Sequence, residues 1–264
     1  MEEKHSKGQY FTEDESLRKT VHSLIFNNPK EILEPSCGRG DLVDDSMRVK
    51  WDLYEIDTNI EPITKHKIIF KDFTKTRITK KYKTIIGNPP FVSRHKQVNL
   101  YIEFIERCYN LLDKNGELIF IIPSNFFQLS SSSTVLKEMY SNGTFTHLFY
   151  PNKENLFKNA AVDVVIFRYE KGMFNRFTNY NGKKYIHNLT NGMFTVNKHS
   201  TKGFSLLGDY FMMTSGVSVF KAKENKKCIL VKQISRKKVI AIKGNLNHYQ
   251  EAYGIVLIPK KRVN

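Results

Sequence analysis

Short apolar runs alternate with longer amphipathic stretches through the first two thirds of the chain. This alternation is typical of a mainly parallel sheet covered by helices, because strands buried on both faces are apolar at nearly every position. Strands are predicted near residues 30–34, 51–56, 67–72, 82–87, 116–122, 146–150 and 162–170. Helices are predicted near residues 13–27, 40–48, 98–113 and 132–141. The pattern therefore predicts an α/β fold.

Two of the predicted helices carry local signals. Thr12 is followed three residues later by Glu15, which is the spacing of a capping box and predicts the start of the first helix. The third helix repeats apolar residues at helical spacing, and we assign these side chains to its core face: Tyr101, Phe104, Ile105, Cys108, Leu111 and Leu112.

Composition narrows the class of protein. A chain of 264 residues with 40% apolar content can form one α/β domain, or one domain with a modest appendage. It has no apolar run long enough to span a membrane and no charged-then-apolar leader. Cys37, Cys108 and Cys228 are widely spaced and odd in number, which favours reduced thiols. We expect an intracellular protein without a membrane partner, either cytoplasmic or associated with a nucleoid or viral factory. The eight histidines form no metal-ligand pair at helical spacing, so no metal is expected.

The ends of the first three predicted strands carry the features of a nucleotide site. The first strand runs into Glu34-Pro35-Ser36-Cys37-Gly38-Arg39-Gly40, where glycines permit a sharp turn and close approach to a ligand. Val43 replaces the third glycine of a dinucleotide fingerprint, which disfavours NAD and FAD. Glu55 ends the second strand, where a carboxylate can accept from a ribose diol. Asp72-Phe73 ends the third strand and offers an acceptor and a ring for an adenine.

The fourth predicted strand ends in Asn88-Pro89-Pro90-Phe91. Each proline fixes φ and removes a backbone donor, so the carbonyls of Asn88 and Pro89 are expected to stay available as acceptors. The Asn88 side chain adds another acceptor, and Phe91 offers a stacking surface. An isolated Asn-Pro-Pro also serves as a simple stop after a buried strand. Together with the three preceding strand ends, it predicts a site that holds a planar amino group.

In this order, the elements resemble the gamma-class adenine-N6 DNA methyltransferases of restriction-modification type, the group that includes the TaqI methylase. The resemblance covers about residues 8–170. It rests on these segments: Gly8 to Thr12, Glu34 to Gly40, Glu55-Ile56, Asp72-Phe73, Asn88 to Phe91, Gly116 to Pro123, and Phe157 before Ala161 to Ile166. It implies a Rossmann-like class I methyltransferase sheet of seven mostly parallel strands, the last one antiparallel.

The resemblance also implies roles for individual residues. Phe11, Thr12, Glu34 and Pro35 would line the methionine end of S-adenosylmethionine, whose product is S-adenosylhomocysteine. The turn residues Ser36, Cys37 and Gly38 belong to the same cofactor site, with Glu55 at the ribose. Ile56 and Phe73 would enclose the adenine, and Asp72 would accept from its amino group. Asn88 and Pro89 would hold the target nitrogen, while Phe91 and Phe157 would contact the extruded base. Phe91 stands where the family has tyrosine, which keeps the stacking surface.

Other substrates present the same planar amino group. The related tetrad Asn-Pro-Pro-Tyr occurs in methyltransferases that act on a glutamine amide of a protein or on an amino group in RNA. A catalytically inactive nucleic-acid-binding subunit is a further alternative. Asn88 favours adenine over cytosine N4, because enzymes of the latter kind usually have serine there.

The positive charge is concentrated in the last third of the chain. Residues 1–170 hold 24 Lys+Arg against 23 Asp+Glu, whereas residues 171–264 hold 18 against 3, which sums to the totals of 42 and 26. Such a charge distribution suits phosphate neutralisation. We expect a catalytic domain over residues 1–172 and a small basic region over residues 173–264 that recognises double-stranded DNA. The family's recognition domain is usually longer, so sequence specificity would rest on a minimal domain, on a partner chain, or on a region that is incomplete here. A companion endonuclease or specificity chain is an expected partner, and the protein is expected to be a monomer.

Overall fold

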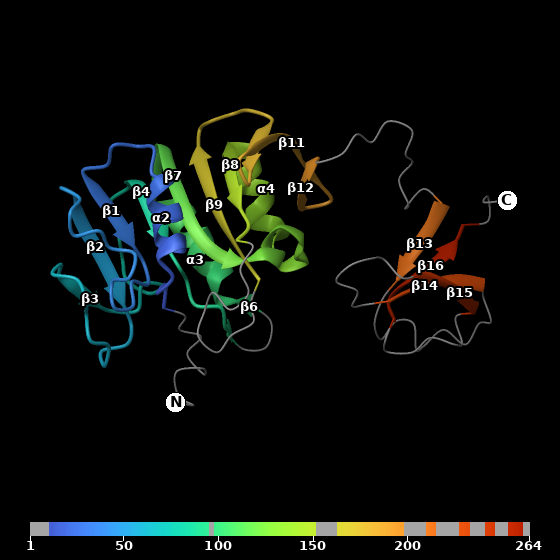
Figure 1. Ribbon diagram of the computed structural model, residues 1–264, viewed down its shortest axis with the longest axis horizontal. Coiled ribbons are helices and arrows are strands. Elements are labelled where there is room, and N and C mark those ends of the chain that lie inside the picture. The colour runs from blue at the N-terminus through green and yellow to red at the C-terminus, as the bar shows by residue number, and fades with distance from the viewer. Residues whose placement is uncertain are drawn as a thin grey trace. The chain divides into compact units, whose positions relative to one another are not determined.

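Within the part of the chain that the structure describes, ten strands form one sheet in the order β12-β11-β10-β8-β9-β7-β4-β1-β2-β3 (Figure 1). This computed structural model describes residues 11–94, 98–151, 163–197, 210–214, 227–232, 241–245 and 253–260. The strands of this sheet are β1 (Glu31–Glu34), β2 (Lys50–Glu55), β3 (Ile68–Phe70), β4 (Tyr82–Gly87), β7 (Leu112–Pro123), β8 (Gly143–Phe149), β9 (Val164–Lys171), β10 (Phe177–Tyr180), β11 (Lys183–Thr190) and β12 (Met193–Asn197).

The centre of the sheet is parallel. β1 pairs in parallel with β2 and β4, β2 with β3, and β4 with β7. β9 lies between β7 and β8 and is antiparallel to both. All seven predicted strands are therefore present, and the predicted mostly parallel sheet with an antiparallel last strand is confirmed. The expected strand number is too low, because β10, β11 and β12 extend the sheet beyond β8.

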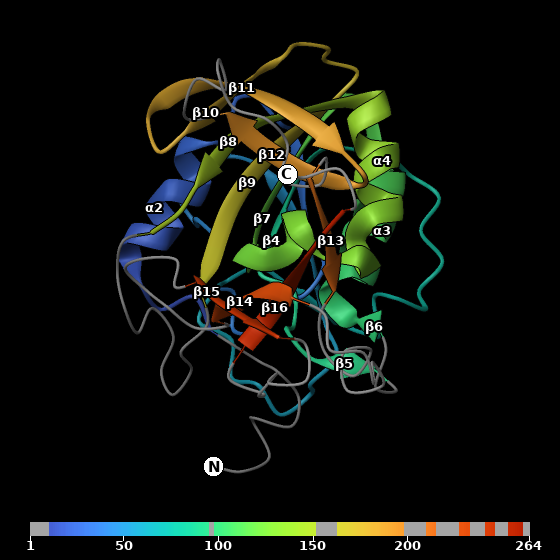
Figure 2. The same cartoon turned by 90° about the vertical axis from the view of Figure 1, so that its right-hand side faces the viewer.

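Helices cover both faces of this sheet. α2 (Glu15–Ser23) lies on one face, whereas α3 (Leu100–Leu111) and α4 (Ser133–Asn142) lie on the other (Figure 2). The two faces hold separate hydrophobic clusters, one around Leu17 and Val21 of α2 and one around Ile105 and Leu136 of α3 and α4. Two short 3₁₀ helices, η1 (Ser124–Gln128) and η2 (Ser130–Ser132), connect β7 to α4. No helix among the described residues is long and apolar enough to cross a membrane.

Two helix predictions are wrong in detail. Residues 40–48 form turns rather than a helix. Gly40 has a φ of 93°, in the left-handed region that interrupts a helix, and the Asp44 side chain accepts from the Ser46 amide in a local turn. The cap of α2 is Asp14, which accepts from the amides of Ser16 and Leu17. Thr12 is therefore not the cap.

A buried ion pair joins the neighbouring strands β7 and β9. Arg168 of β9 and Glu117 of β7 are 2% and 0% exposed, and their charged groups lie 2.8 Å apart. The Glu117 carboxylate also accepts from the backbone amides of Phe26 and Asn27 and from the hydroxyl of Thr84. Because every oxygen is matched, this carboxylate anchors the segment after α2 to the sheet.

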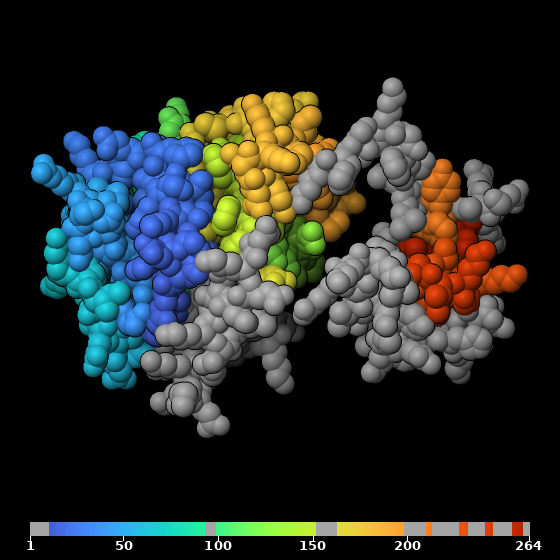
Figure 3. All heavy atoms as spheres, in the orientation of Figure 1, coloured from blue at the N-terminus to red at the C-terminus, as the bar shows by residue number. Residues whose placement is uncertain are grey.

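The chain divides into two compact units, residues 1–198 and residues 199–264. The boundary expected after residue 172 is thus too early, because β10 to β12 pair with the main sheet. In Figure 3 the first unit shows its earliest strands at one end, in blue and cyan, and these late strands at the other, in yellow and orange. The described part of the second unit is an antiparallel sheet in the order β13 (Phe211–Thr214), β16 (Tyr253–Pro259), β14 (Lys227–Lys232) and β15 (Ala241–Asn245).

In the first unit, a two-stranded ladder, β5 (Ser93–Arg94) and β6 (Val98–Asn99), precedes α3.

Candidate active site

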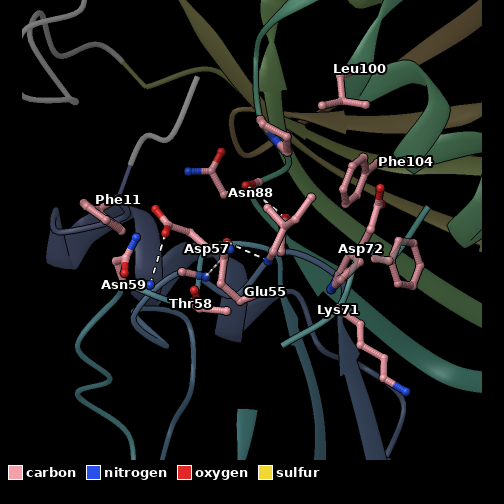
Figure 4. Close-up of a pocket in the computed structure, with 16 residues that line it drawn as sticks. Phe11, Glu55, Asp57, Thr58, Asn59, Lys71, Asp72, Asn88, Leu100 and Phe104 are labelled. Atoms are coloured by element: carbon pink, nitrogen blue, oxygen red, sulfur yellow. Dashed lines mark hydrogen bonds between the residues drawn. The ribbon is translucent and has the colours of Figure 1, made fainter. Parts of the chain in front are cut away.

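A cavity of about 460 Å³ opens where β1, β2, β3 and β4 end. These strands are parallel, so their carboxyl ends meet at one edge of the sheet, where α/β proteins bind nucleotides. The cavity is lined by several of the predicted site residues: Phe11, Pro35, Ser36, Gly38, Glu55, Ile56, Asp72, Phe73, Asn88 and Pro90. Figure 4 shows Phe11 and Asn59 at one end, Leu100 and Phe104 at the other, and Asn88 between them.

The turn after β1 brings bare backbone to the cavity wall. Gly38 has a φ of 55°, and a Cβ there would meet the Phe11 ring at 3.2 Å. The guanidinium of Arg39 lies 4.7 Å from the centre of the same ring and pairs with Asp41 at 2.9 Å. Gly38 is therefore required both by its backbone conformation and by the aromatic side chain packed against it.

Glu55 is the anchor of this edge of the sheet. Its side chain accepts three backbone hydrogen bonds, from Gly38 at 2.9 Å and from Ile56 and Asp57 at 2.8 Å each. The carboxylate thus fixes the β1 turn to the end of β2, and it faces the cavity (Figure 4). Ile56 beside it is 59% exposed and offers an apolar surface to a ligand.

The end of β3 is supported by α3. Asp72 accepts from the amide and hydroxyl of Thr74, at 2.9 and 2.6 Å, and lines the cavity. The Phe73 ring stacks on Phe104, with ring centres 5.5 Å apart, and the Arg107 guanidinium lies 5.0 Å from its centre. Phe73 is only 2% exposed. Its ring therefore offers a ligand only a small part of its surface.

The tetrad meets the cavity through Asn88 and Pro90. The Asn88 side-chain amide donates to the hydroxyl of Thr12 at 3.1 Å. The Asn88 backbone carbonyl, which we expected to remain available, accepts a long hydrogen bond of 3.4 Å from Ser36. Pro89 is buried. Phe91 is partly buried, and its ring contacts Tyr101 edge to face.

Acidic groups are buried beneath the cavity. Glu34 is 1% exposed, and its pKa is raised well above 4.5 by burial and then by the nearby carboxylates of Asp41 and Glu55. Burial also raises the pKa of the Cys37 thiol, which disfavours a reactive thiolate. Glu34, Cys37 and Thr12 therefore support the wall from behind rather than line it.

Some residues of the site were not found from sequence. Phe104 and Leu100 of α3 line the cavity, although the helical spacing assigned Phe104 to the core. Asp57, Thr58 and Asn59 line it as well, and only their position after β2 would have indicated this. Phe157, predicted to contact the base, lies outside the described residues. Among the described residues no cluster of His, Cys, Asp and Glu could hold a metal ion.

The site fits a nucleotide-like cofactor that carries positive charge. Its volume is within the range of small-molecule pockets, it has bare backbone at Gly38, and it presents carboxylates at the ends of β2 and β3. The raised pKa of the buried Glu34 carboxyl favours its neutral form, so the carboxylates of Glu55 and Asp72 carry the negative charge at the cavity wall.

Comparison with known proteins agrees with this geometry. Residues 30–157 match the Eco57I restriction-modification methylase family. The Type II methyltransferase M.HincII from Haemophilus influenzae is 31% identical over 195 residues, which are 64% of this chain and 38% of that protein. The chain thus spans less than two fifths of that relative.

Solved structures share the fold at low sequence identity. A Listeria monocytogenes protein described as a class I S-adenosylmethionine-dependent methyltransferase has a TM-score of 0.51 and 16% identity, over 64% of this chain and 65% of that one. A type I restriction-modification methyltransferase subunit from Streptococcus thermophilus has a TM-score of 0.53 and 13% identity, over 72% and 50%. Residues 30–157 therefore form an Eco57I-type restriction-modification methylase domain, and the surrounding fold is that of the class I S-adenosylmethionine-dependent methyltransferases.

Proposed function

We propose that this protein transfers a methyl group from S-adenosylmethionine to the N6 atom of an adenine extruded from duplex DNA. One observation carries the proposal: Asn88 of the tetrad lines the same cavity as Glu55 and Asp72. A donor held by the two carboxylates and a target held by the tetrad would therefore meet in one enclosed space.

The cavity wall supplies the cofactor contacts of this proposal. Glu55 binds the ribose hydroxyls, and Asp72 accepts from the adenine amino group. The exposed side chain of Ile56 covers one face of the adenine, with Phe73 and Phe104 at the other. When bound, S-adenosylmethionine supplies an electrophilic methyl group on a positively charged sulfur. The carboxylates of Glu55 and Asp72 at the cavity wall favour a ligand with that charge.

The tetrad positions the target. Asn88 and the carbonyl of Pro89 accept hydrogen bonds from the target amino group, which directs the nitrogen lone pair toward the cavity. Thr12 holds the Asn88 amide nitrogen, so the orientation of this amide is fixed. Phe91 stacks on the base, and so does Phe157 by resemblance alone. Alignment and exclusion of water then lower the barrier, and no strong base is needed to begin.

The choice of DNA as the substrate polymer rests on the relatives and on the charge of the second unit. The named relatives are methyltransferases of restriction-modification systems, which favours DNA over RNA or a protein glutamine. The second unit holds 13 Lys+Arg against 3 Asp+Glu, a net charge of 13 − 3 = +10, and we assign it to DNA binding. Residues 173–197 belong to the first unit's sheet and are not part of this assignment. A companion endonuclease or specificity chain, and the monomeric state, stay predictions.

The test is a labelling experiment with separate substrates. The full chain is incubated with S-adenosylmethionine tritiated on its methyl group and with duplex DNA, RNA or a glutamine-containing release-factor peptide, and the labelled product is hydrolysed and identified. We expect N6-methyladenine from duplex DNA. Label in cytosine, RNA or the peptide would replace this assignment. Label in no polymer, with normal cofactor binding, would support an inactive binding subunit.

A further inference from the structure

A second cavity lies outside the cofactor site. It has a volume of about 420 Å³ and is lined by aromatic and amide side chains: Asn125, Phe127, Gln128, Tyr150, Tyr180 and Phe194 among them. We call it the tyrosine pocket. None of its lining residues is shared with the cofactor cavity.

The tyrosine pocket opens at the same edge of the sheet as the tetrad. Asn125 and Gln128 follow the carboxyl end of β7, and Tyr150 follows that of β8. Both strands run in the direction of β4, since β4 and β7 are parallel and β9 is antiparallel to both β7 and β8. Strand β7 is the direct neighbour of β4, and β8 is three strand spacings away, or roughly 14 Å. A polymer strand bound at the tetrad would therefore reach this pocket.

The aromatic pair in this pocket is held rigidly. Tyr150 and Tyr180 stack with ring centres 4.9 Å apart and an interplanar angle of 26°. The side chain of Asn181 accepts from the Tyr150 amide at 2.7 Å and donates to its carbonyl at 3.0 Å. Asn181 has a φ of 44°, a left-handed conformation that asparagine tolerates better than most residues. A platform fixed on both backbone groups loses little freedom when a ring stacks on it.

The chemistry of the lining selects the class of ligand. No charged side chain lines the tyrosine pocket among the described residues, so it suits neither a phosphate nor a cation. Buried Phe127 and Phe194 form an apolar floor, and the exposed amides of Asn125 and Gln128 can each donate and accept at its rim. Stacking surfaces with such amides are the means by which proteins hold unstacked bases. Lys183, paired with Tyr180 across the β10–β11 turn, adds a positive charge for the backbone of a strand.

We propose that the tyrosine pocket binds an unstacked nucleobase of the DNA strand, a second base besides the one held at the tetrad. The proposal rests on the proposed function only for the identity of the polymer. The stack on Tyr150 and Tyr180 provides the affinity, and the amides of Asn125 and Gln128 read the edge of the base.

The test uses the full chain and a fluorescent oligothymidylate of about twelve nucleotides, which contains no adenine and so reports binding without methyl transfer. We expect the double variant Asn125→Ala, Gln128→Ala to bind it roughly ten-fold more weakly, whereas the exposed amide variant Asn110→Ala, on α3, binds normally. Both variants should bind S-adenosylmethionine like the wild type, since no substituted residue lines the cofactor cavity.

A photocrosslinking experiment maps the contact directly. With 4-thiothymidine in the oligomer, we expect crosslinks to Tyr150 or Tyr180 in the wild-type chain. Unchanged affinity of the double variant, equal binding of an abasic oligomer, or crosslinks confined to other segments would each overturn the pocket. If the wild-type chain forms these crosslinks but transfers no methyl group to duplex DNA, the result would contradict the proposed function and leave the base-binding pocket supported.

Discussion

The Glu55 carboxylate fixes the turn after β1 in this structure and binds the ribose in the proposed function, and Glu55→Gln tests both roles. In the folded protein the side chain accepts from the amides of Ile56 and Asp57 through one oxygen and of Gly38 through the other. Glutamine keeps the shape but turns one oxygen into an NH2 group, which would face a backbone donor. At least one charge-assisted hydrogen bond is lost, and an N–H group is left unmatched.

The expected cost follows from this loss. A hydrogen bond to a charged group contributes about 1.5 to 3 kcal/mol, so the free energy of unfolding should fall by about that amount. For a domain of this size, the melting temperature should fall by about 3 to 12 °C. If Glu55 also binds the ribose, the affinity for S-adenosylmethionine should drop by roughly ten-fold or more, since about 1.4 kcal/mol corresponds to a factor of ten.

Two measurements separate the structural role of Glu55 from its proposed contact with the ribose. Thermal unfolding without ligand reports the link between the turn after β1 and the end of β2, and titration calorimetry at a temperature where the variant is folded reports cofactor affinity. Glu61→Gln, an exposed change of the same kind in the following loop, is the matched control and should alter neither quantity. An unchanged melting temperature would refute the structural argument. A lowered melting temperature with cofactor affinity within two-fold of the wild type would refute the ribose contact.

Four further outcomes are expected. Asn88→Ala should abolish methyl transfer to DNA while cofactor affinity, measured by calorimetry, stays within a few fold; full turnover would reject its role. Glu117→Gln should lower the free energy of unfolding in urea by about 1.5 to 3 kcal/mol, because it removes a charge-assisted hydrogen bond from buried Arg168, which keeps only Glu170 at 2.9 Å as its counter-charge, and a loss below about 1 kcal/mol would contradict this. Burial lowers the pKa of His187 below 6.5, so the unfolded state binds more protons and stability should fall as the pH drops through 6.5; His187→Phe should flatten this pH dependence, and an equal slope in both proteins would exclude His187 as its source. Ending the chain after Lys198 should weaken DNA binding and flatten its salt dependence, and an unchanged salt slope would place the phosphate contacts in the first unit.

Local sequence patterns predicted the elements that carry the site. Each of the seven predicted strands forms, because an apolar run bounded by polar residues can be buried in only a few ways. Glu55, Asp72 and Asn88 follow strands that run in parallel, so their convergence at one edge follows from strand direction alone. The position of the cavity could therefore be predicted from little more than the order of the motifs along the chain.

Contacts between residues far apart in the chain decided the rest. Thr12 has the sequence context of a helix cap, yet it accepts from Asn88, 76 residues away, and Asp14 caps the helix. Phe104 has the spacing of a core residue, yet α3 packs so that its ring also lines the cavity.

By itself the sequence determined the strands, the turns at their ends and the chemistry placed there, because these depend on neighbouring residues. Only the tertiary structure decided that β10 to β12 join the main sheet and that Glu55 fixes the turn after β1. It also decided that a pocket of stacked tyrosines opens at the same edge of the sheet as the tetrad. The physical reason is that packing energy is shared among segments distant in the chain, and no local pattern records which of them will meet.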